Sequence, residues 1–343
     1  MTKIAIVGCG KITTSYHLPA ALVSPRVQLS ALVDVNVENA RALAEKYKIG
    51  CQVAQDLNEV ISQVDGVLIA TPNHTHFPLA RIALAHGKPV LIEKPMTIAY
   101  SEAIALCELA ENNKSFISVG FKTRYYPSVI LLKRLLEEKK FGEIYGFHYE
   151  YGTKGGWSPV SGYNINPEMS GGGVLINGGT HFIDRMLYWF GEPAALTYED
   201  DSYGGVEANC KAVFSFEGFT GTLFVSKTVA LKNGFFLDTQ KYLCELGEAQ
   251  SETITLYPKD NSDLKMELSL ESSFQGEPPR HYYFQKQLEE FANAIETGGP
   301  VTVSGRFAAR SVKLIETMYK TRSQLAEPWR VYNRPHQSNS IGE

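Results

Sequence analysis

Up to about Val119 the sequence alternates short apolar runs with longer amphipathic segments, and this alternation constrains the fold more than any other feature. We expect strands near residues 3–7, 28–33, 66–70, 89–92 and 116–119, with helices near 11–23, 37–47, 76–86 and 101–112 between them. Strands that alternate with helices in this way form a parallel sheet with helices on both faces. The sequence therefore predicts an α/β fold with a doubly wound parallel sheet over residues 1–122.

After Arg124 the pattern changes, because one expected helix near 127–138 leads into a series of strands. These strands are expected near residues 143–152, 206–216, 219–229, 235–246, 252–257 and 263–270, and helices near 281–297 and 305–323 follow them. Apolar and polar residues alternate along the strands, which is typical of an antiparallel sheet with one covered face. We expect an α+β domain with a large, mainly antiparallel open sheet over residues 123–333, and a polar tail over 334–343.

Composition and net charge restrict the kinds of molecule that this protein can bind. A chain of 343 residues with 44% hydrophobic content fits two globular domains. The formal net charge of -4 and the lack of a basic stripe argue against a nucleic-acid partner. No apolar run is long enough to cross a bilayer, and Ile4–Val7 is too short for the core of a signal peptide. The five cysteines are scattered, without a C-x-x-C motif or Cys/His metal spacing, so we expect a cytoplasmic protein with no metal site and no membrane contact.

The apolar strand Ile4–Val7 runs into a glycine turn, Gly8-Cys9-Gly10-Lys11-Ile12-Thr13, and then into a helix. This arrangement directs free backbone N–H groups and the positive end of the helix dipole at a pyrophosphate. A Cβ at Gly8 or Gly10 would obstruct the tight turn or the approaching phosphate. The chain departs from the usual G-x-G-x-x-G motif in one place, because Thr13 replaces the third glycine. The sequence predicts a Rossmann domain that binds a dinucleotide, and the alternative is a similar domain that binds another nucleotide or nothing.

Asp34 ends the second expected strand, where a carboxylate can accept hydrogen bonds from an adenosine ribose diol. The same carboxylate would repel a 2′-phosphate, and no arginine lies between Val33 and Asn39 to receive one. We therefore expect NAD as the cofactor, with NADP less favoured.

Two polar segments follow neighbouring expected strands of the first domain. Thr71-Pro72-Asn73 comes after residues 66–70, and Glu93-Lys94-Pro95 comes after residues 89–92. Both lie at carboxyl ends of parallel strands, where open α/β sheets bind ligands. A lysine between an acid and a proline is held firmly and partly desolvated, which lowers its pKa toward the range of an acid/base catalyst. Lys94 is thus a candidate acid/base, and the alternative is a surface lysine in a turn.

A glycine-rich run from Ser170 to Gly173 precedes a helical segment that carries Asn177, His181 and Asp184. Glycines before a helix let the backbone approach a ligand closely, and residues 177, 181 and 184 share one helical face. We expect these three side chains to form a polar cluster at the site. The alternative is a helix with a single hydrogen-bonded core histidine.

Together these features resemble the glucose-fructose oxidoreductase / inositol dehydrogenase family (Gfo/Idh/MocA) over nearly the whole chain. The resemblance is carried by the glycine turn at 8–10, Asp34, Thr71-Pro72-Asn73-His74, Glu93-Lys94-Pro95, Arg124 with Pro127, the glycine-rich run that ends in His181 and Asp184, and the stretch from Phe291 to Tyr319 with Val303-Ser304-Gly305. It implies an NAD(P)-dependent dehydrogenase or ketoreductase that acts on a carbinol of a sugar, sugar derivative or cyclitol. It also implies a C-terminal substrate and oligomerisation domain that forms a homodimer or homotetramer through its open sheet.

By resemblance, Lys94 and His181 bind the reacting oxygen and handle its proton while a hydride passes to or from nicotinamide C4. Family members often have an aspartate where this chain has Asn177, and an amide cannot relay a proton as a carboxylate can. Lys94 therefore becomes the favoured primary acid/base, and we expect Asn177 to orient a substrate hydroxyl. Cofactor contacts are expected from Gly8, Gly10, Lys11, Ile12, Asp34, Val35, Thr71, Pro72, Asn73, His76, Glu93, Lys94 and Arg124. Substrate contacts are expected from Lys122, Trp157, Tyr163, Asn164, Thr180 and Tyr282.

Two alternative functions remain open on the same scaffold. The first is a glycosidase-like reaction that recycles a bound NAD within each turnover, and the absence of a stoichiometric NADH signal would mark it. The second is a non-catalytic NAD-binding protein, which Asn177 favours and which bound cofactor without turnover would mark. The substrate itself, and the carbon that reacts, are not specified by these motifs.

Overall fold

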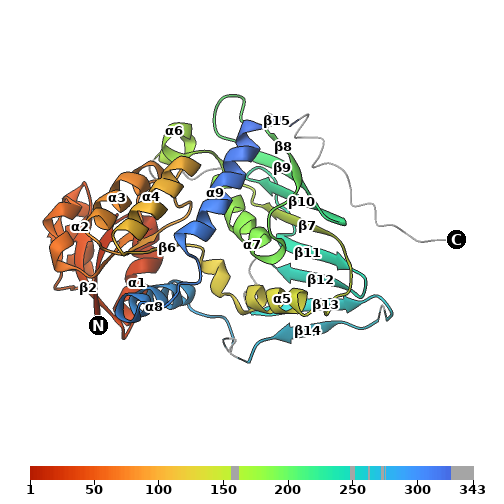
Figure 1. Cartoon of the computed structure of the whole chain (residues 1–343), viewed down its shortest axis with the longest axis horizontal. Helices are drawn as coiled ribbons and strands as arrows, with labels where there is room; N and C mark the ends of the chain where they lie inside the picture. The colour runs from red at the N-terminus through yellow and green to blue at the C-terminus, as the bar shows by residue number, and fades with distance from the viewer. Residues whose placement is uncertain (156–161, 248–251, 262, 272–273, 275, 326–343) are drawn as a thin grey trace.

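The computed structural model describes residues 1–155, 162–247, 252–261, 263–271, 274 and 276–325, and these form two sheets with helices packed around them (Figure 1). Trp157 and the expected tail at 334–343 lie outside the described residues. Among the described residues, no helix is both long enough and apolar enough to pass through a membrane.

The first sheet contains the strands β1 (Thr2–Val7), β2 (Val27–Val33), β3 (Gln52–Ala54), β4 (Gly66–Ile69), β5 (Val90–Ile92) and β6 (Ile117–Val119). Their order is β3-β2-β1-β4-β5-β6, and every neighbouring pair is parallel. This is the predicted doubly wound arrangement, with the chain crossing from one side of β1 to the other between β3 and β4. The strand ends near this crossing are where ligands bind in such sheets.

Helices cover both faces of the first sheet, because side chains of β1 point alternately to its two sides. Ala5 and Val7 pack with α3 (His76–Ala85) and α4 (Tyr100–Asn112), whereas Ile4 and Ile6 pack with α1 (Leu18–Val23) and α2 (Val37–Lys46). Helix α8 (Tyr282–Thr297) joins the second group through Leu288, Phe291 and Ala292, which are almost fully buried. The chain therefore returns to the first sheet near its C-terminal end, where α8 lies beside α1 (Figure 1).

The second sheet contains the strands β7 (Ile144–Gly152), β8 (Ala195–Asp200), β9 (Asn209–Phe216), β10 (Phe219–Ser226), β11 (Gly234–Thr239), β12 (Tyr242–Gly247), β13 (Thr253–Pro258), β14 (Met266–Ser269) and β15 (Ser323–Gln324). Their order is β14-β13-β12-β11-β7-β10-β9-β8-β15. The sheet is mostly antiparallel as expected, but β7 runs parallel to β10 and β15 runs parallel to β8. Helices α5 (Pro127–Glu137), α7 (Thr180–Phe190) and α9 (Gly305–Lys320) pack on it, and α9 also contacts α4 of the first domain.

Several elements differ from the sequence expectation. The expected strand at 235–246 is a hairpin of two strands, β11 and β12. In the turn between them, the backbone N–H of Gln240 donates to the carbonyl of Glu143, which precedes β7. Strands β3, β8 and β15 were not predicted. The expected helix at 11–23 contains a π-helical segment, η1 (Thr13–His17), and a second such segment, η7 (Leu175–Gly179), precedes α7. Short turns of helix complete the chain: η2 (Leu57–Glu59), η3 (Ile61–Gln63), η4 (Asn73–Thr75), η5 (Lys122–Tyr125), η6 (Tyr163–Ile165) and α6 (Pro167–Ser170).

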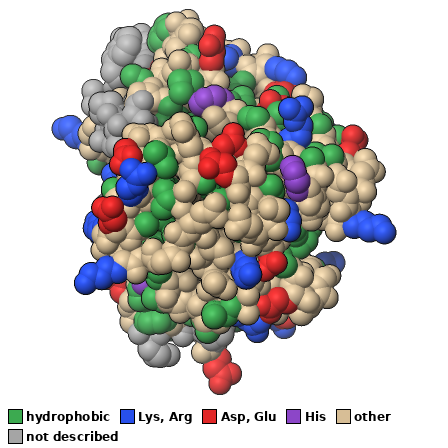
Figure 2. Space-filling view, turned by 90° about the vertical axis from the view of Figure 1, so that its left-hand side faces the viewer, with side chains coloured by type: hydrophobic (Ala, Val, Ile, Leu, Met, Phe, Trp, Pro, Cys, Tyr) green, Lys and Arg blue, Asp and Glu red, His purple; other side chains and the backbone are tan. Residues whose placement is uncertain are grey.

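Figure 2 shows the end of the molecule formed by the first domain. Acidic and basic side chains alternate over this face, with hydrophobic side chains scattered among them. Nucleic-acid backbones bind to stripes of lysine and arginine, and the described side chains on this face are not arranged in that way.

Candidate functional site

The glycine turn after β1 has room for a phosphate where the sequence predicts it. Gly8 has a φ of +96°, and a Cβ there would overlap the carbonyl oxygen of Ala70 at the end of β4, so a glycine is required. Gly10 is different, because a Cβ built on it would meet no atom within 4 Å. The turn is therefore tight on the sheet side and open on the other side, as a pyrophosphate site requires.

Asp34 lies beside this turn at the end of β2. Its Oδ2 accepts a hydrogen bond of 2.8 Å from the backbone N–H of Cys9, and its Oδ1 accepts from the N–H of Asn36 at 2.9 Å and from the side-chain amide of Asn39 at 3.2 Å. Burial, together with the Asp34 carboxylate, raises the pKa of the Cys9 thiol to about 12, so the thiol stays neutral. Val35 follows as an exposed side chain at the rim of the turn.

His76 lies beneath both polar segments and connects them. Its Nδ1 is 2.9 Å from the carbonyl oxygen of Pro95, and its Nε2 is 2.9 Å from the carbonyl oxygen of Thr71. Burial lowers the pKa of His76, although the two carbonyls oppose this effect. A neutral imidazole has one N–H, so it donates to one of these carbonyls at a time. The sequence predicted a cofactor contact here, and the observed contacts give His76 a role in holding the two segments together.

Glu93 and Lys94 follow directly after β5, and Lys94 lines a cavity between the two domains. Glu93 is 9% exposed, and its Oε1 lies 2.8 Å from Nε2 of His17, a residue of η1. Burial alone would raise the pKa of Glu93, but the hydrogen bond and charge of His17 and the charge of Lys94 bring the pKa below its usual value. His17 packs edge-on against Phe284 of α8, with ring centroids 4.9 Å apart. An acidic side chain is thus held ionised directly beside Lys94.

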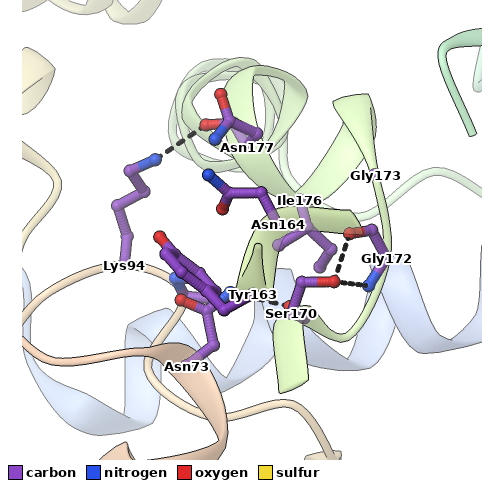
Figure 3. A pocket seen from close by; sticks show the side chains of 10 residues that line it. Asn73, Lys94, Tyr163, Asn164, Ser170, Gly172, Gly173, Ile176 and Asn177 are labelled. Atoms are coloured by element: carbon purple, nitrogen blue, oxygen red, sulfur yellow. Dashed lines mark hydrogen bonds between the residues drawn. The ribbon is translucent and has the colours of Figure 1, made fainter. Parts of the chain in front are cut away.

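The side chain of Lys94 extends to the helical segment of the second domain that carries Asn177 (Figure 3). Its Nζ donates a hydrogen bond of 2.7 Å to the backbone carbonyl of Asn177 in η7. Burial lowers the pKa of Lys94, the Glu93 carboxylate opposes this, and the charges of Lys122 and Lys227 add to the lowering. This is the direction that the sequence predicted for an acid/base lysine.

A polar cavity with a volume of about 40 Å³ lies between these segments (Figure 3). It is lined by Asn73, Lys94, Pro95, Tyr163, Asn164, Ser170, Gly172, Gly173, Ile176 and Asn177. Asn73 also joins its two walls, because its side-chain amide donates to the carbonyl of Ser170 at 2.7 Å. The cavity therefore brings together residues that the sequence predicted separately from the two domains.

His181 lies one helical turn beyond Asn177 on α7. Burial lowers the pKa of His181 well below its usual value, and the charges of Lys94, Lys122 and Arg185 act in the same direction. Its Nδ1 is buried and has no hydrogen-bond partner among the described residues. The imidazole is therefore neutral at neutral pH.

The predicted cluster of Asn177, His181 and Asp184 is divided in the structure. Asp184 is fully buried, and its Oδ2 lies 3.7 Å from a guanidinium nitrogen of Arg124. The guanidinium carbon of Arg124 also lies 3.5 Å from the centroid of the Tyr188 ring. Burial raises the pKa of Asp184 to about 7, against the opposing charges of Arg124 and Arg185. The π-helical segment η7 changes the rotation along the helix, so Asn177 lines the cavity while Asp184 pairs with Arg124. The cofactor contact predicted for Arg124 stays a prediction, and its observed contacts are structural.

The other predicted contacts lie in varied surroundings. Lys122 has its Nζ 5.0 Å from the ring of Phe284 and 5.7 Å from that of Tyr16. Thr180 is fully buried, and its hydroxyl has no partner among the described residues. Tyr282 packs against Phe274, with ring centroids 5.1 Å apart. Lys11 is exposed, and the partly buried Ile12 packs on the face of the first sheet that carries Ile4 and Ile6.

Sequence reasoning missed His17, Glu207 and Tyr319. His17 lies on the helix that follows the glycine turn, so a histidine there was a detectable signal. Glu207 and Tyr319 hydrogen-bond near the glycine-rich segment from distant parts of the chain, and no local pattern marks them.

The fold and this site together define a two-domain protein of the dinucleotide-binding class. A family model described as an oxidoreductase family with an NAD-binding Rossmann fold matches residues 2–121, and the model of the same family's C-terminal domain matches residues 129–242. The chain belongs to the Gfo/Idh/MocA family.

Individual relatives agree with this assignment. D-glucoside 3-dehydrogenase of Escherichia coli (strain K12) is 28% identical over 212 residues, which cover 61% of this chain and 60% of that protein. The rhizopine catabolism protein MocA of Rhizobium meliloti is 26% identical over 326 residues, which cover 90% of this chain and 92% of that protein. The chain spans between 54% and 60% of the length of some of the curated relatives it matches.

A solved structure shares the fold over nearly the whole chain. Levoglucosan dehydrogenase, in complex with NADH and levoglucosan, aligns with a TM-score of 0.82 at 20% identity, covering 93% of this chain and 96% of that one.

Proposed function

We propose that this protein is an NAD-dependent oxidoreductase that transfers a hydride between nicotinamide and a carbinol or ketone carbon of a sugar, sugar derivative or cyclitol. The observation that carries the proposal is the Lys94 ammonium group, which lies in a polar cavity between the domains and donates to the Asn177 carbonyl at 2.7 Å. The sugar class is supported by the names of relatives such as D-glucoside 3-dehydrogenase and of the structural neighbour levoglucosan dehydrogenase.

The residues around the glycine turn fit a dinucleotide. The open space at Gly10 suits the pyrophosphate, Asp34 suits the adenosine ribose, and the segments at 71–73 and 93–95 extend the site toward the cavity. When bound, the nicotinamide would supply or accept the hydride. One proton leaves the hydroxyl on oxidation and returns on reduction. Lys94 would hydrogen-bond to the reacting oxygen and exchange this proton with it, and neutral His181 would pass the same proton onward. Asn177 would orient a neighbouring hydroxyl through its side chain.

The test is Lys94→Ala combined with a substrate screen. Wild-type protein is assayed with polyols, cyclitols and sugar nucleotides by NADH absorbance, and the variant is assayed with whichever compound is turned over. We expect turnover to fall by a factor of about 30 to 1,000, since acid/base groups contribute about 2–4 kcal/mol to the barrier. NAD affinity should stay within a few-fold, and Lys140→Ala, at an exposed ion pair with Glu138, is the matched control.

Near-normal turnover in Lys94→Ala would make this lysine structural and refute the assignment. Bound NAD without turnover of any compound would favour a non-catalytic protein. Turnover without stoichiometric NADH would favour the reaction that recycles its cofactor.

We further propose that the protein prefers NAD to NADP. The Asp34 carboxylate would repel a 2′-phosphate, and the segment from Val33 to Asn39 contains no arginine that could receive one. Competing calorimetric titrations of the two cofactors should show NAD binding at least about tenfold more tightly. Tighter binding of NADP at ordinary ionic strength would contradict this assignment.

Two structural expectations also stay proposals: the domain boundary between residues 122 and 123, and association as a homodimer or homotetramer through the open face of the second sheet. Light scattering of the full chain gives the number of copies.

A further inference from the structure

Glu207 accepts hydrogen bonds from the backbone N–H groups of three consecutive residues at the start of the helical segment that carries Asn177 and His181. Its Oε2 accepts from Gly173 at 2.8 Å and its Oε1 accepts from Leu175 at 2.9 Å. Its own backbone carbonyl accepts from Val174 at 2.9 Å. Glu207 is only 1% exposed, so these hydrogen bonds are shielded from water.

Tyr319, on α9, completes the arrangement by donating its hydroxyl hydrogen to Oε1 of Glu207 at 2.9 Å. Gly172 and Gly173 pack closely against Tyr319 and Glu207. A Cβ at Gly172 would overlap the Tyr319 hydroxyl, and a Cβ at Gly173 would overlap the carbonyl oxygen of Glu207. The glycine-rich run is therefore explained, in this part of its length, by the approach of these two residues.

Two further hydrogen bonds connect this segment to Lys94. The carbonyl of Gly173 accepts from the backbone N–H of Asn177 at 3.0 Å, and the carbonyl of Asn177 accepts from Nζ of Lys94 at 2.7 Å. A displacement of residues 173–175 would thus move the acceptor of the Lys94 ammonium group. Negative charge at the start of a helix is favourable as well, because the helix dipole is positive there.

We propose that Glu207, held by Tyr319, is a positioning residue for Lys94. It fixes the start of the helical segment, which places the Asn177 carbonyl that receives the Lys94 ammonium group. The inference rests on the proposed function insofar as Lys94 is taken as the acid/base group.

Two substitutions separate this role from general stabilisation. Glu207→Gln keeps the shape but turns an N–H₂ group toward the N–H of Gly173 or Leu175, so one hydrogen bond is lost and two donors face each other. Tyr319→Phe removes only the donor to Glu207 and is the milder change. The charged groups that face Lys94 are Glu93 from its own segment, Lys122 from η5 and Lys227 after β10, and both variants leave them unchanged. Glu192→Gln, at an exposed ion pair with Arg310, is the matched control.

The experiment measures the pKa of Lys94 directly in the full chain, without any substrate. Lysines are reductively methylated with ¹³C formaldehyde, and the Lys94 signal is assigned by its loss in Lys94→Arg. Because a carbonyl acceptor stabilises the charged amine, Glu207→Gln should lower the pKa of Lys94 by about 0.5 to 1 and Tyr319→Phe by less, with no change in Glu192→Gln. Hydrogen exchange at residues 173–175 should become faster in the same order.

Faster exchange with an unchanged pKa of Lys94 would overturn the proposal, as would no change in either measurement. If Glu207→Gln does not fold, the same comparison is made with Tyr319→Phe. Failure of the proposed function is seen separately, since it appears in the substrate screen and leaves the pKa and exchange results standing.

Discussion

Two glycine-rich segments lead into helices in this protein, and they differ in how closely other residues pack on their glycines. The first, at Gly8 to Gly10, has open space beside Gly10. The second, at Gly171 to Gly173, packs directly onto Glu207, whose carboxylate accepts two of the N–H groups at the start of the helical segment. Both continue into a π-helical segment, η1 and η7. Each segment donates to a carboxylate of the protein, the first from the N–H of Cys9 to Asp34. The first also leaves open space beside Gly10, where an anion from outside can bind, whereas the glycines of the second are closely packed.

This difference adds a second reason for the glycines of the later segment. Glycines before a helix predicted a close approach of the backbone to a ligand in both places. Gly172 and Gly173 do line the cavity, but the positions that a Cβ would take are filled by Tyr319 and Glu207. The comparison teaches that a glycine run marks a close approach of some partner, and that only the packed structure shows whether the partner is a ligand or a side chain.

The largest expected effect is on stability, from Gly173→Ala. The added methyl group would overlap the backbone of Glu207, which cannot move without shifting three hydrogen bonds. We expect the free energy of unfolding to fall by about 3 kcal/mol or more, measured by urea unfolding followed by circular dichroism. A loss below about 0.5 kcal/mol would show that this segment adapts and that the comparison is wrong.

Gly10→Ala should show the opposite behaviour and serves as the matched control. Its methyl group meets no atom within 4 Å, so the stability should change by less than about 0.5 kcal/mol. The same methyl group would occupy the space assigned to the pyrophosphate, and NAD should bind about tenfold more weakly or worse by calorimetry. Unchanged NAD affinity would mean that the open side of the turn is not the phosphate site.

The smallest effect is expected from Asn177→Asp. The backbone carbonyl that receives Lys94 is retained, so turnover should change by less than about threefold. A carboxylate here favours the charged form of His181 and raises its pKa, which would move the acidic limb of the pH–rate profile to higher pH if His181 must change charge. We expect this limb to stay nearly in place, because Lys94 is assigned as the main acid/base group. A several-fold gain in turnover with a displaced limb would transfer the main proton step to His181.

Most of the first domain could be predicted because its central strands are buried on both faces and read as continuous apolar runs. Strands β1, β2, β4, β5 and β6 lie within a few residues of the expected ranges. The missed strands lie at or near sheet edges: β3 ends the first sheet, and β15 and β8 end the second. These three strands bury few side chains and so carry a weak pattern, whereas β6, at the other edge of the first sheet, is buried and was predicted. The strand expected at 235–246 was wrong because its turn at Gln240-Lys241 contains none of the residues that usually mark a turn.

The sequence by itself determined the parts of the site that depend on local order along the chain. Gly8, Gly10, Asp34 and Lys94 each follow a buried strand, and parallel strands bring their carboxyl ends to one edge whatever the rest of the molecule does. The tertiary structure alone decided which partners meet there. It divided the expected triad by pairing Asp184 with Arg124, and it brought Glu207 and Tyr319, 112 residues apart in the chain, to the start of a helical segment. The physical reason is that a hydrogen bond between distant residues depends on how sheets and helices pack, and hydrophobic periodicity records only which faces are buried.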